Sequence, residues 1–175
     1  MRKKKVLFIC THNSARSQMA EGFLRRLYGD RYEAYSAGTE PSEVNPYAVR
    51  VMEEVGIDIS NHRSKGVEEF RGWEFDWVAT VCDQAEERCP FLPGAERYIH
   101  KGFPDPSKSA GDENEVLERF RKVRDEIKRW IEVTFAPPSS SSVRSRAGVE
   151  GRNTDLRGRS DDIRGDRGGH PRINP

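Results

Sequence analysis

A stretch near the amino end, residues 6–22, constrains the fold more than any other part of the chain. It begins with four apolar residues that do not alternate with polar ones, a pattern typical of a buried strand in a parallel sheet. Small polar residues follow, and apolar residues then return at helical spacing. A buried strand therefore leads through a short loop to the N-terminus of a helix. Such a turn directs several backbone N–H groups and the positive end of a helix dipole into one concavity, which suits a tetrahedral oxyanion.

Two reactive groups flank this loop, the thiol of Cys10 and, six residues later, the guanidinium of Arg16. Arg16 can hold an oxyanion through two parallel hydrogen bonds, and its charge favours the thiolate over the thiol. The alternative is a buried, unreactive cysteine at a strand end with an ordinary surface arginine. That alternative does not account for the cluster of polar residues around them. We therefore predict an anion-binding site formed by Cys10, Thr11, His12, Asn13, Ser14, Ala15, Arg16 and Ser17.

Apolar runs alternate with amphipathic patterns along the chain as far as residue 135. The runs predict strands at residues 4–9, 32–37, 75–81 and 97–99. The amphipathic patterns predict helices at residues 17–28, 46–55 and 114–135, and a shorter helix that Ser64 caps and that runs through Phe70. This alternation implies an α/β fold, a doubly wound four-stranded parallel sheet with helices on both faces. Ligands of such sheets bind beyond the carboxyl ends of the strands, where Cys10 lies.

The composition changes at residue 137, where two prolines and four serines open a segment rich in Arg, Gly and Asp. Such a segment cannot bury enough apolar surface to offset its ordering entropy. We therefore predict one domain over residues 1–136 and a disordered polar tail over residues 137–175. An Arg/Gly segment can bind RNA, but acidic residues interrupt the basic run, so nucleic-acid binding is not expected.

Charge and hydropathy indicate which binding partners and which cellular compartment to expect. The chain carries 30 basic and 29 acidic residues, a balance that argues against a dedicated nucleic-acid or membrane surface. The apolar run after the basic N-terminus is too short for a signal peptide, and no stretch approaches a membrane span. We therefore expect a cytoplasmic protein. In that reducing compartment, three cysteines favour free thiols with redox or nucleophilic roles over structural disulfides.

The two remaining thiols, Cys82 and Cys89, follow the third predicted strand. Cys82 comes directly after that strand, so it is expected near the same sheet edge as Cys10. Residues 83–88 favour a helix, and residues seven apart on a helix lie about 10 Å apart along its axis. Because a disulfide needs Cα atoms roughly 4.4–6.8 Å apart, pairing of these cysteines requires the helix to unwind or bend. The alternative is two small, half-buried residues beside a surface helix.

The loop sequence and the three cysteines together resemble the thioredoxin-coupled arsenate reductases of the low-molecular-weight protein tyrosine phosphatase superfamily. The resemblance covers about residues 4–135, and the tail has no counterpart in that family. Besides the loop at residues 10–21, the matching segments lie at residues 35–38, 44–46, 57–62, 103–106 and 123–127.

The resemblance implies that the protein reduces arsenate to arsenite, for arsenic detoxification. Cys10 would attack arsenate held by Arg16 and the loop amides, with Ser17 as hydrogen-bond donor to the sulfur. Asp105, between two prolines, would be the general acid that protonates the leaving hydroxide; the alternative for Asp105 is an ordinary turn residue beside proline.

The same resemblance implies a relay of disulfides. Cys82 would attack the sulfur of Cys10 and release arsenite, and Cys89 would then form a Cys82–Cys89 redox disulfide. An external dithiol protein, thioredoxin or glutaredoxin, would reduce that disulfide again.

The chain departs from the family pattern at three positions. His12 and Ala15 stand where many relatives have Gly and Cys, and His12 is expected to take a left-handed backbone. Lys65 stands where relatives that bind potassium carry an acid. We therefore expect this chain to use no resident cofactor and no metal, with the Lys65 ammonium in place of a potassium ion near Asn13, Glu21 and Ser36.

Two other functions remain open at this point. A low-molecular-weight protein tyrosine phosphatase would use Cys10, Arg16 and Asp105 alike, with water completing the cycle. Residual phosphatase activity can also persist in a reductase, because phosphate and arsenate are near isosteres. A non-catalytic redox or arsenite-binding module would need the thiols alone and would leave Arg16 and Asp105 without a role.

Overall fold

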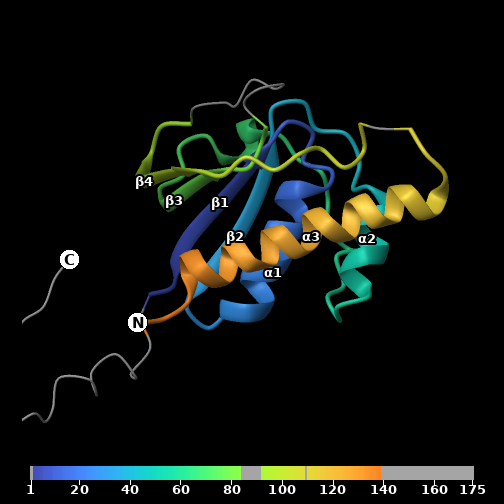
Figure 1. Cartoon of the computed structure of the whole chain (residues 1–175). Helices are drawn as coiled ribbons and strands as arrows, with labels where there is room; N and C mark the ends of the chain where they lie inside the picture. Colours follow the sequence, from blue (N-terminus) through green and yellow to red (C-terminus); the bar gives the residue numbers. More distant parts are fainter. Residues whose placement is uncertain (1, 84–91, 109, 139–175) are drawn as a thin grey trace, which may run out of the picture. The chain divides into compact units, whose positions relative to one another are not determined.

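The computed structural model describes residues 2–83, 92–108 and 110–138. In chain order, the secondary-structure elements in these ranges are β1 (Lys4–Cys10), α1 (Arg16–Tyr28), β2 (Tyr32–Gly38), α2 (Pro46–Glu53), the 3₁₀ helix η1 (Val67–Phe70), β3 (Phe75–Thr80), β4 (Ala95–His100) and α3 (Glu113–Phe135) (Figure 1). No helix in these ranges has the length and apolar character needed to cross a membrane.

The four strands form one parallel sheet in the order β2-β1-β3-β4. The chain first places β2 on one side of β1 and then places β3 on the other side, so the direction of winding reverses at β1. The predicted doubly wound, four-stranded parallel sheet is therefore confirmed. The reversal brings the carboxyl ends of β1 and β3 side by side, and sheets of this kind bind their ligands at that point.

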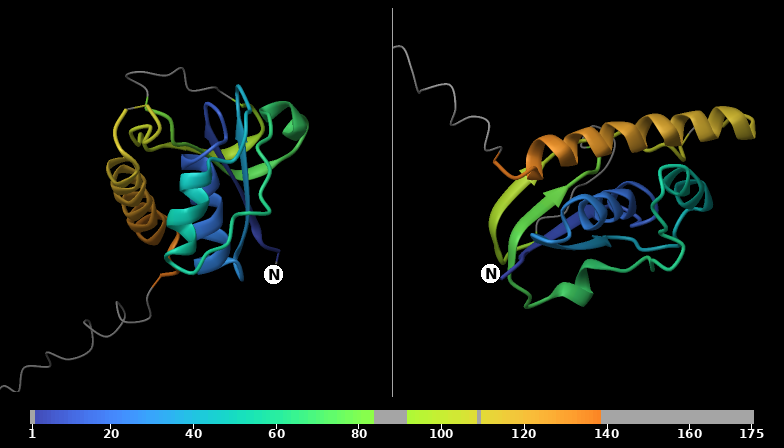
Figure 2. Two further views of the ribbon diagram at one scale, coloured as in Figure 1. Left: turned by 90° about the vertical axis from the view of Figure 1, so that its right-hand side faces the viewer. Right: turned by 90° about the horizontal axis from the view of Figure 1, so that it is seen from below.

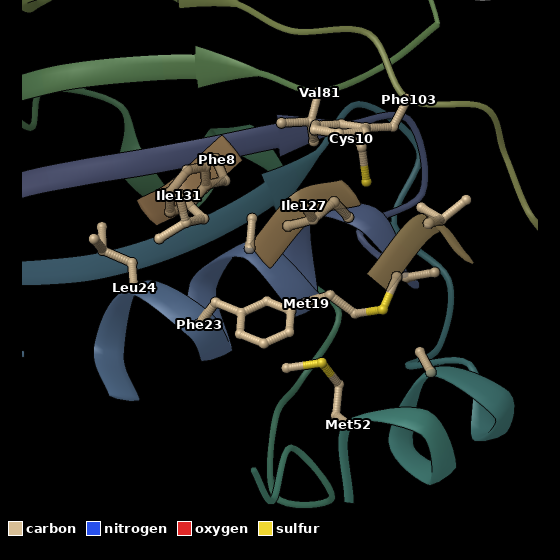
Figure 3. Packing of buried hydrophobic residues seen from close by; sticks show 14 of the residues in the cluster. Phe8, Cys10, Met19, Phe23, Leu24, Met52, Val81, Phe103, Ile127 and Ile131 are labelled. Atoms are coloured by element: carbon tan, nitrogen blue, oxygen red, sulfur yellow. The ribbon is translucent and has the colours of Figure 1, made fainter. Parts of the chain in front are cut away.

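α1 and α3 lie on one side of the sheet, where α2 packs against α3, and η1 lies on the other side (Figure 2). On the first face, Phe8 of β1 packs in one core with Phe23 of α1 and Ile127 of α3 (Figure 3). On the second face, Leu7 of β1 belongs to a smaller core with Phe70 of η1. Successive side chains of a strand point to opposite faces, so β1 must be apolar from Val6 to Cys10 to fill both cores. This is why its sequence shows no alternation.

Three local predictions were wrong. The second helix ends at Glu53 rather than at residue 55, and β4 is longer than predicted because edge pairing with β3 uses main-chain groups and tolerates polar side chains. Ser64 does not cap the short helix, whose N-cap is Gly66. The Ser64 hydroxyl instead accepts a hydrogen bond from Ser42 N and donates one to the carbonyl of His12.

Candidate active site

The carboxyl end of β1 opens into a small cavity of about 170 Å³. The strand carries Cys10 to this cavity, where the residue is 2% exposed and lies near Val81 and Phe103 (Figure 3). α1 begins at Arg16, and none of the side chains that the structure describes caps its first turn, so backbone N–H groups at this end remain available to a ligand. The residues that line the cavity are Cys10, His12, Ser14, Ala15, Arg16, Ser42, Asp105 and Ser107.

The loop between β1 and α1 turns its carbonyl groups away from the cavity. Each carbonyl from Thr11 to Ser14 accepts a hydrogen bond of 2.8–3.2 Å from outside the loop. Because the N–H of a trans peptide points opposite to the carbonyl before it, these bonds direct the loop N–H groups toward the cavity. Hydrogen bonds from residues outside the loop thus hold it in a shape that fits an anion. Most of the donors of these bonds belong to residues 39–45. In order along the loop, the donors are Glu40 N, Ser42 N together with Ser64 Oγ, Gln18 Nε2, and Asn45 N.

Asn13, and not His12, takes the left-handed backbone in this loop, with φ at +49°, so the expectation for His12 was wrong. Asparagine adopts this conformation more readily than most residues. The Asn13 side chain is fully buried, donates to Ser17 Oγ at 2.8 Å, and accepts from Gln18 Nε2 at 2.9 Å and from Lys65 N at 3.0 Å. The residue that carries the backbone strain is therefore also held by its own side chain.

Ser17 connects Asn13 to the thiol. The Asn13 amide nitrogen can only donate, so Ser17 Oγ accepts from it and directs its own hydroxyl proton elsewhere. Cys10 Sγ lies 2.9 Å from Ser17 Oγ, and a thiolate at Cys10 has no proton of its own, so the Ser17 hydroxyl is then the donor of this hydrogen bond. A donated hydrogen bond stabilises a thiolate relative to a thiol.

The Arg16 guanidinium is 3% exposed and lies between the anion-binding loop and the segment that carries Asp105. Its Nη1 donates to the carbonyl of Phe103 at 3.1 Å, and its Nη2 lies 3.7 Å from Asp105 Oδ2. One cavity therefore brings together a thiol, a guanidinium and a carboxyl group. These groups suffice for nucleophilic attack on a bound oxyanion with acid assistance to the leaving group.

Cys82 lies beyond the end of β3, beside the strand that carries Cys10. Its Sγ donates to the carbonyl of Ile9 at 3.7 Å, and the residue is fully buried. Two of the three thiols are thus at one sheet edge. Cys89 and residues 84–88 of the predicted helix lie outside the described residues, so the pairing of Cys82 with Cys89 stays a prediction.

The predicted anion-binding residues divide into two groups. Cys10, His12, Ser14, Ala15 and Arg16 line the cavity, whereas Thr11, Asn13 and Ser17 support the loop from behind. Two residues that line the cavity, Ser42 and Ser107, are not among the predicted ones. Ser107 had a detectable signal, because the Asp-x-Ser spacing is typical of an Asx turn. Ser42 carries no such sequence signal, because it is distant from the loop in the sequence and lies beside it only in the folded chain.

A buried group of charges lies behind the loop. Glu21 is 4% exposed, with its Oε2 2.9 Å from His62 Nδ1 and its Oε1 3.9 Å from Lys65 Nζ. Burial by itself would raise the pKa of Glu21, but the hydrogen bond from His62 and the charge of Lys65 outweigh it and lower that pKa. Burial lowers the pKa of Lys65, against the charge of Glu21. Lys65 Nζ also donates to Ser36 Oγ at 3.4 Å and to the carbonyl of Arg63 at 3.2 Å.

Comparison with known proteins agrees with this geometry. The profile of the family described as low molecular weight phosphotyrosine protein phosphatase matches residues 5–137. A protein named arsenate reductase from Halalkalibacterium halodurans is 46% identical over 136 residues, which are 78% of this chain and 97% of that protein. A protein of the same name from Bacillus subtilis is 45% identical over 127 residues, 73% of this chain and 91% of that protein.

Solved structures show the same relationship. A structure described as an arsenate reductase in the phosphate binding state has a TM-score of 0.64 and 38% identity, and the match covers 74% of this chain and 95% of that one. A thioredoxin-dependent arsenate reductase from Corynebacterium glutamicum has a TM-score of 0.51 and 28% identity over 75% of this chain and 63% of that one. With its Cys10–Arg16 loop at the switch point of the sheet and a family profile that matches most of its length, the chain belongs to the low molecular weight phosphotyrosine protein phosphatase family.

Proposed function

We propose that this protein reduces arsenate to arsenite and serves arsenic detoxification. The observation that carries the proposal is the pair of thiols at the ends of neighbouring strands, Cys10 in the cavity and Cys82 hydrogen-bonded to the carbonyl of Ile9. Hydrolysis of a phosphate ester needs one thiol, whereas reduction of arsenic needs a second thiol that can attack the first. The relatives named arsenate reductase support the same conclusion.

In the first step, the Cys10 thiolate attacks the arsenic of an arsenate held by Arg16 and the loop N–H groups. An As–S bond forms and an As–O bond breaks. The leaving hydroxide takes the proton of Asp105 and departs as water. The hydrogen bond from Ser17 stabilises the thiolate before the attack.

In the second step, a Cys82 thiolate attacks Cys10 Sγ. A disulfide forms and the electron pair of the As–S bond stays on arsenic, so As(V) becomes As(III) and leaves as arsenite. Cys89 then attacks Cys82, which frees Cys10 and leaves a Cys82–Cys89 disulfide. An external dithiol protein restores both thiols, and the thioredoxin-dependent structural neighbour favours thioredoxin over glutaredoxin.

The cavity does not favour an aryl phosphatase as the main activity. No aromatic side chain is among the described residues that line it, so that lining offers no partner for the ring of a phosphorylated tyrosine. We therefore expect hydrolysis of aryl phosphates as a weak side activity. A cytoplasmic location, where thioredoxin is kept reduced, is part of the proposal and stays a prediction from the sequence.

The test of the function is a coupled assay with purified full-length protein, thioredoxin, thioredoxin reductase and NADPH. We expect NADPH oxidation that depends on arsenate, and Cys10→Ser is the control that removes it. After one turnover without thioredoxin, thiol counting should find two thiols lost per chain. Absence of arsenate-dependent turnover with both thioredoxin and glutaredoxin as reductants would contradict the proposal.

We further propose that Lys65 replaces a potassium ion, because its ammonium already pairs with Glu21 and Ser36. The melting temperature should then be the same within about 1 °C in sodium and in potassium chloride of equal ionic strength, since a ligand that does not bind cannot stabilise. Lys65→Asp should restore a carboxylate and create a potassium-specific rise. A potassium-specific rise in the unmodified protein would show that the ammonium does not exclude the ion.

A further inference from the structure

Asp105 and Ser107 lie together in the wall of the cavity, on the connection between β4 and α3. Ser107 makes two hydrogen bonds to one carboxylate oxygen, from its backbone N to Oδ1 at 2.9 Å and from its Oγ to Oδ1 at 2.7 Å. The other oxygen, Oδ2, faces Arg16 Nη2 at 3.7 Å. The Asp105 side chain is 10% exposed, so water has little access to it. The two oxygens of Asp105 therefore lie in unequal surroundings.

This inequality decides where a proton can reside. A carboxylate oxygen accepts hydrogen bonds through two lone pairs, and the two donors of Ser107 occupy both lone pairs of Oδ1. A proton taken up by the carboxyl group is therefore left with Oδ2. Oδ2 is on the side of Arg16, and so on the side of any oxyanion that Arg16 holds.

We infer that Ser107 is a positioning residue that places the acidic proton of Asp105 on the oxygen facing the leaving hydroxide. The inference rests on the proposed role of Asp105 as the general acid. When the As–O bond breaks, the Oδ2–H bond breaks with it, and the hydroxide and the proton leave together as water. Asp105 is left as a carboxylate that keeps both hydrogen bonds from Ser107, and such charge-assisted bonds are stronger than neutral ones.

The neighbouring prolines alone cannot determine which oxygen of Asp105 carries the proton. Pro104 and Pro106 restrict the backbone on either side of Asp105. The final torsion of an aspartate side chain is broad and roughly two-fold, so a stiff backbone does not select one oxygen over the other. The hydrogen bonds from Ser107 supply that selection.

The first test compares substitutions at Ser107 by the rate of the first turnover, followed as loss of free thiols after mixing with arsenate. Ser107→Ala should lower that rate about tenfold, because it removes part of a general-acid effect worth about 10²–10⁴. The half-saturating arsenate concentration should stay within about twofold, because the loop and Arg16 still hold the anion. Ser107→Thr keeps the hydroxyl and should keep the rate.

A second Asp-x-Ser turn offers a matched control. Ser60 N donates to Asp58 Oδ1 at 2.8 Å in an exposed turn whose residues do not line the cavity. Ser60→Ala should leave the rate unchanged. An unchanged rate in Ser107→Ala, or equal losses in Ser107→Ala and Ser60→Ala, would overturn the inference.

The second test separates positioning from simple support of the loop. Asp105→Asn has no acidic proton, so adding Ser107→Ala to it should change the rate by less than about twofold. An equal tenfold loss from Ser107→Ala in both backgrounds would overturn the inference. If the unmodified protein turns over no arsenate, the proposed function fails instead. The same variants then test Ser107 independently in the hydrolysis of phenyl phosphate, whose poor leaving group needs the same acid.

Discussion

Replacing Cys82 by serine is expected to slow multiple-turnover arsenate reduction by at least about 1,000-fold, because no thiol is left to attack Cys10 and release arsenic as As(III). Serine is close to cysteine in size and can keep the hydrogen bond that Cys82 donates to the carbonyl of Ile9, so the buried site should stay folded. Hydrolysis of an aryl phosphate needs Cys10, Arg16 and Asp105 alone, and it should persist within about threefold. The two activities are measured on the same preparation.

Cys89→Ser is the companion variant, and it should fail at a later step. It should complete one round of reduction and stop as a Cys10–Cys82 disulfide, with one equivalent of arsenite released. Mass spectrometry of the trapped protein identifies that linkage. Full multiple-turnover reduction by either variant would contradict the relay while leaving the anion site intact.

Gly38→Ala is expected to destabilise the protein by about 1–3 kcal/mol and to lower kcat/KM by about 100-fold. A Cβ at Gly38 would lie 2.6 Å from the carbonyl oxygen of Thr11 and 2.7 Å from the backbone N of Asn13. Both are main-chain atoms of the anion-binding loop, so the clash cannot be relieved by rotating a side chain. The loop must shift, and a displacement of its N–H groups weakens their aim at the oxyanion.

Gly66 provides the control for this prediction, because it forms the isolated bridge to Gly38 on the opposite segment. A Cβ at Gly66 would meet nothing closer than Pro41 Cγ at 3.6 Å, an ordinary contact. Gly66→Ala should therefore leave both the urea unfolding curve and kcat/KM close to those of the unmodified protein. Equal tolerance of alanine at both glycines would mean that the loop is not held against the end of β2.

Much of the fold could be predicted because its signals are local. The uninterrupted apolar run of β1 indicates that both faces of this strand are buried. Because a helical pattern follows directly, Cys10 and Arg16 are predicted at the same edge of the sheet. Cys82 comes directly after a predicted strand, which predicts its position at that edge too. The structure shows its Sγ hydrogen-bonded to the carbonyl of Ile9.

The details of the site depend on contacts between distant segments, and these were not predictable. The donors from residues 39–45 that shape the anion-binding loop carry no local pattern. The left-handed residue was assigned to His12, although Asn13 has the side chain that its neighbours Ser17, Gln18 and Lys65 can hold in place. Hydrogen-bond partners of that kind appear once the chain is folded.

Arg16 joins the two halves of the site. It belongs to the segment of the nucleophile, yet its Nη1 binds the carbonyl of Phe103, 87 residues away, two positions before the acid. A substitution at Arg16 accordingly removes a group that binds the anion, and it also removes the hydrogen bond that holds the segment carrying Asp105. Such a variant therefore binds the anion more weakly and protonates the leaving hydroxide more slowly at the same time. Neither loss by itself measures how much the contact between the guanidinium and the anion contributes.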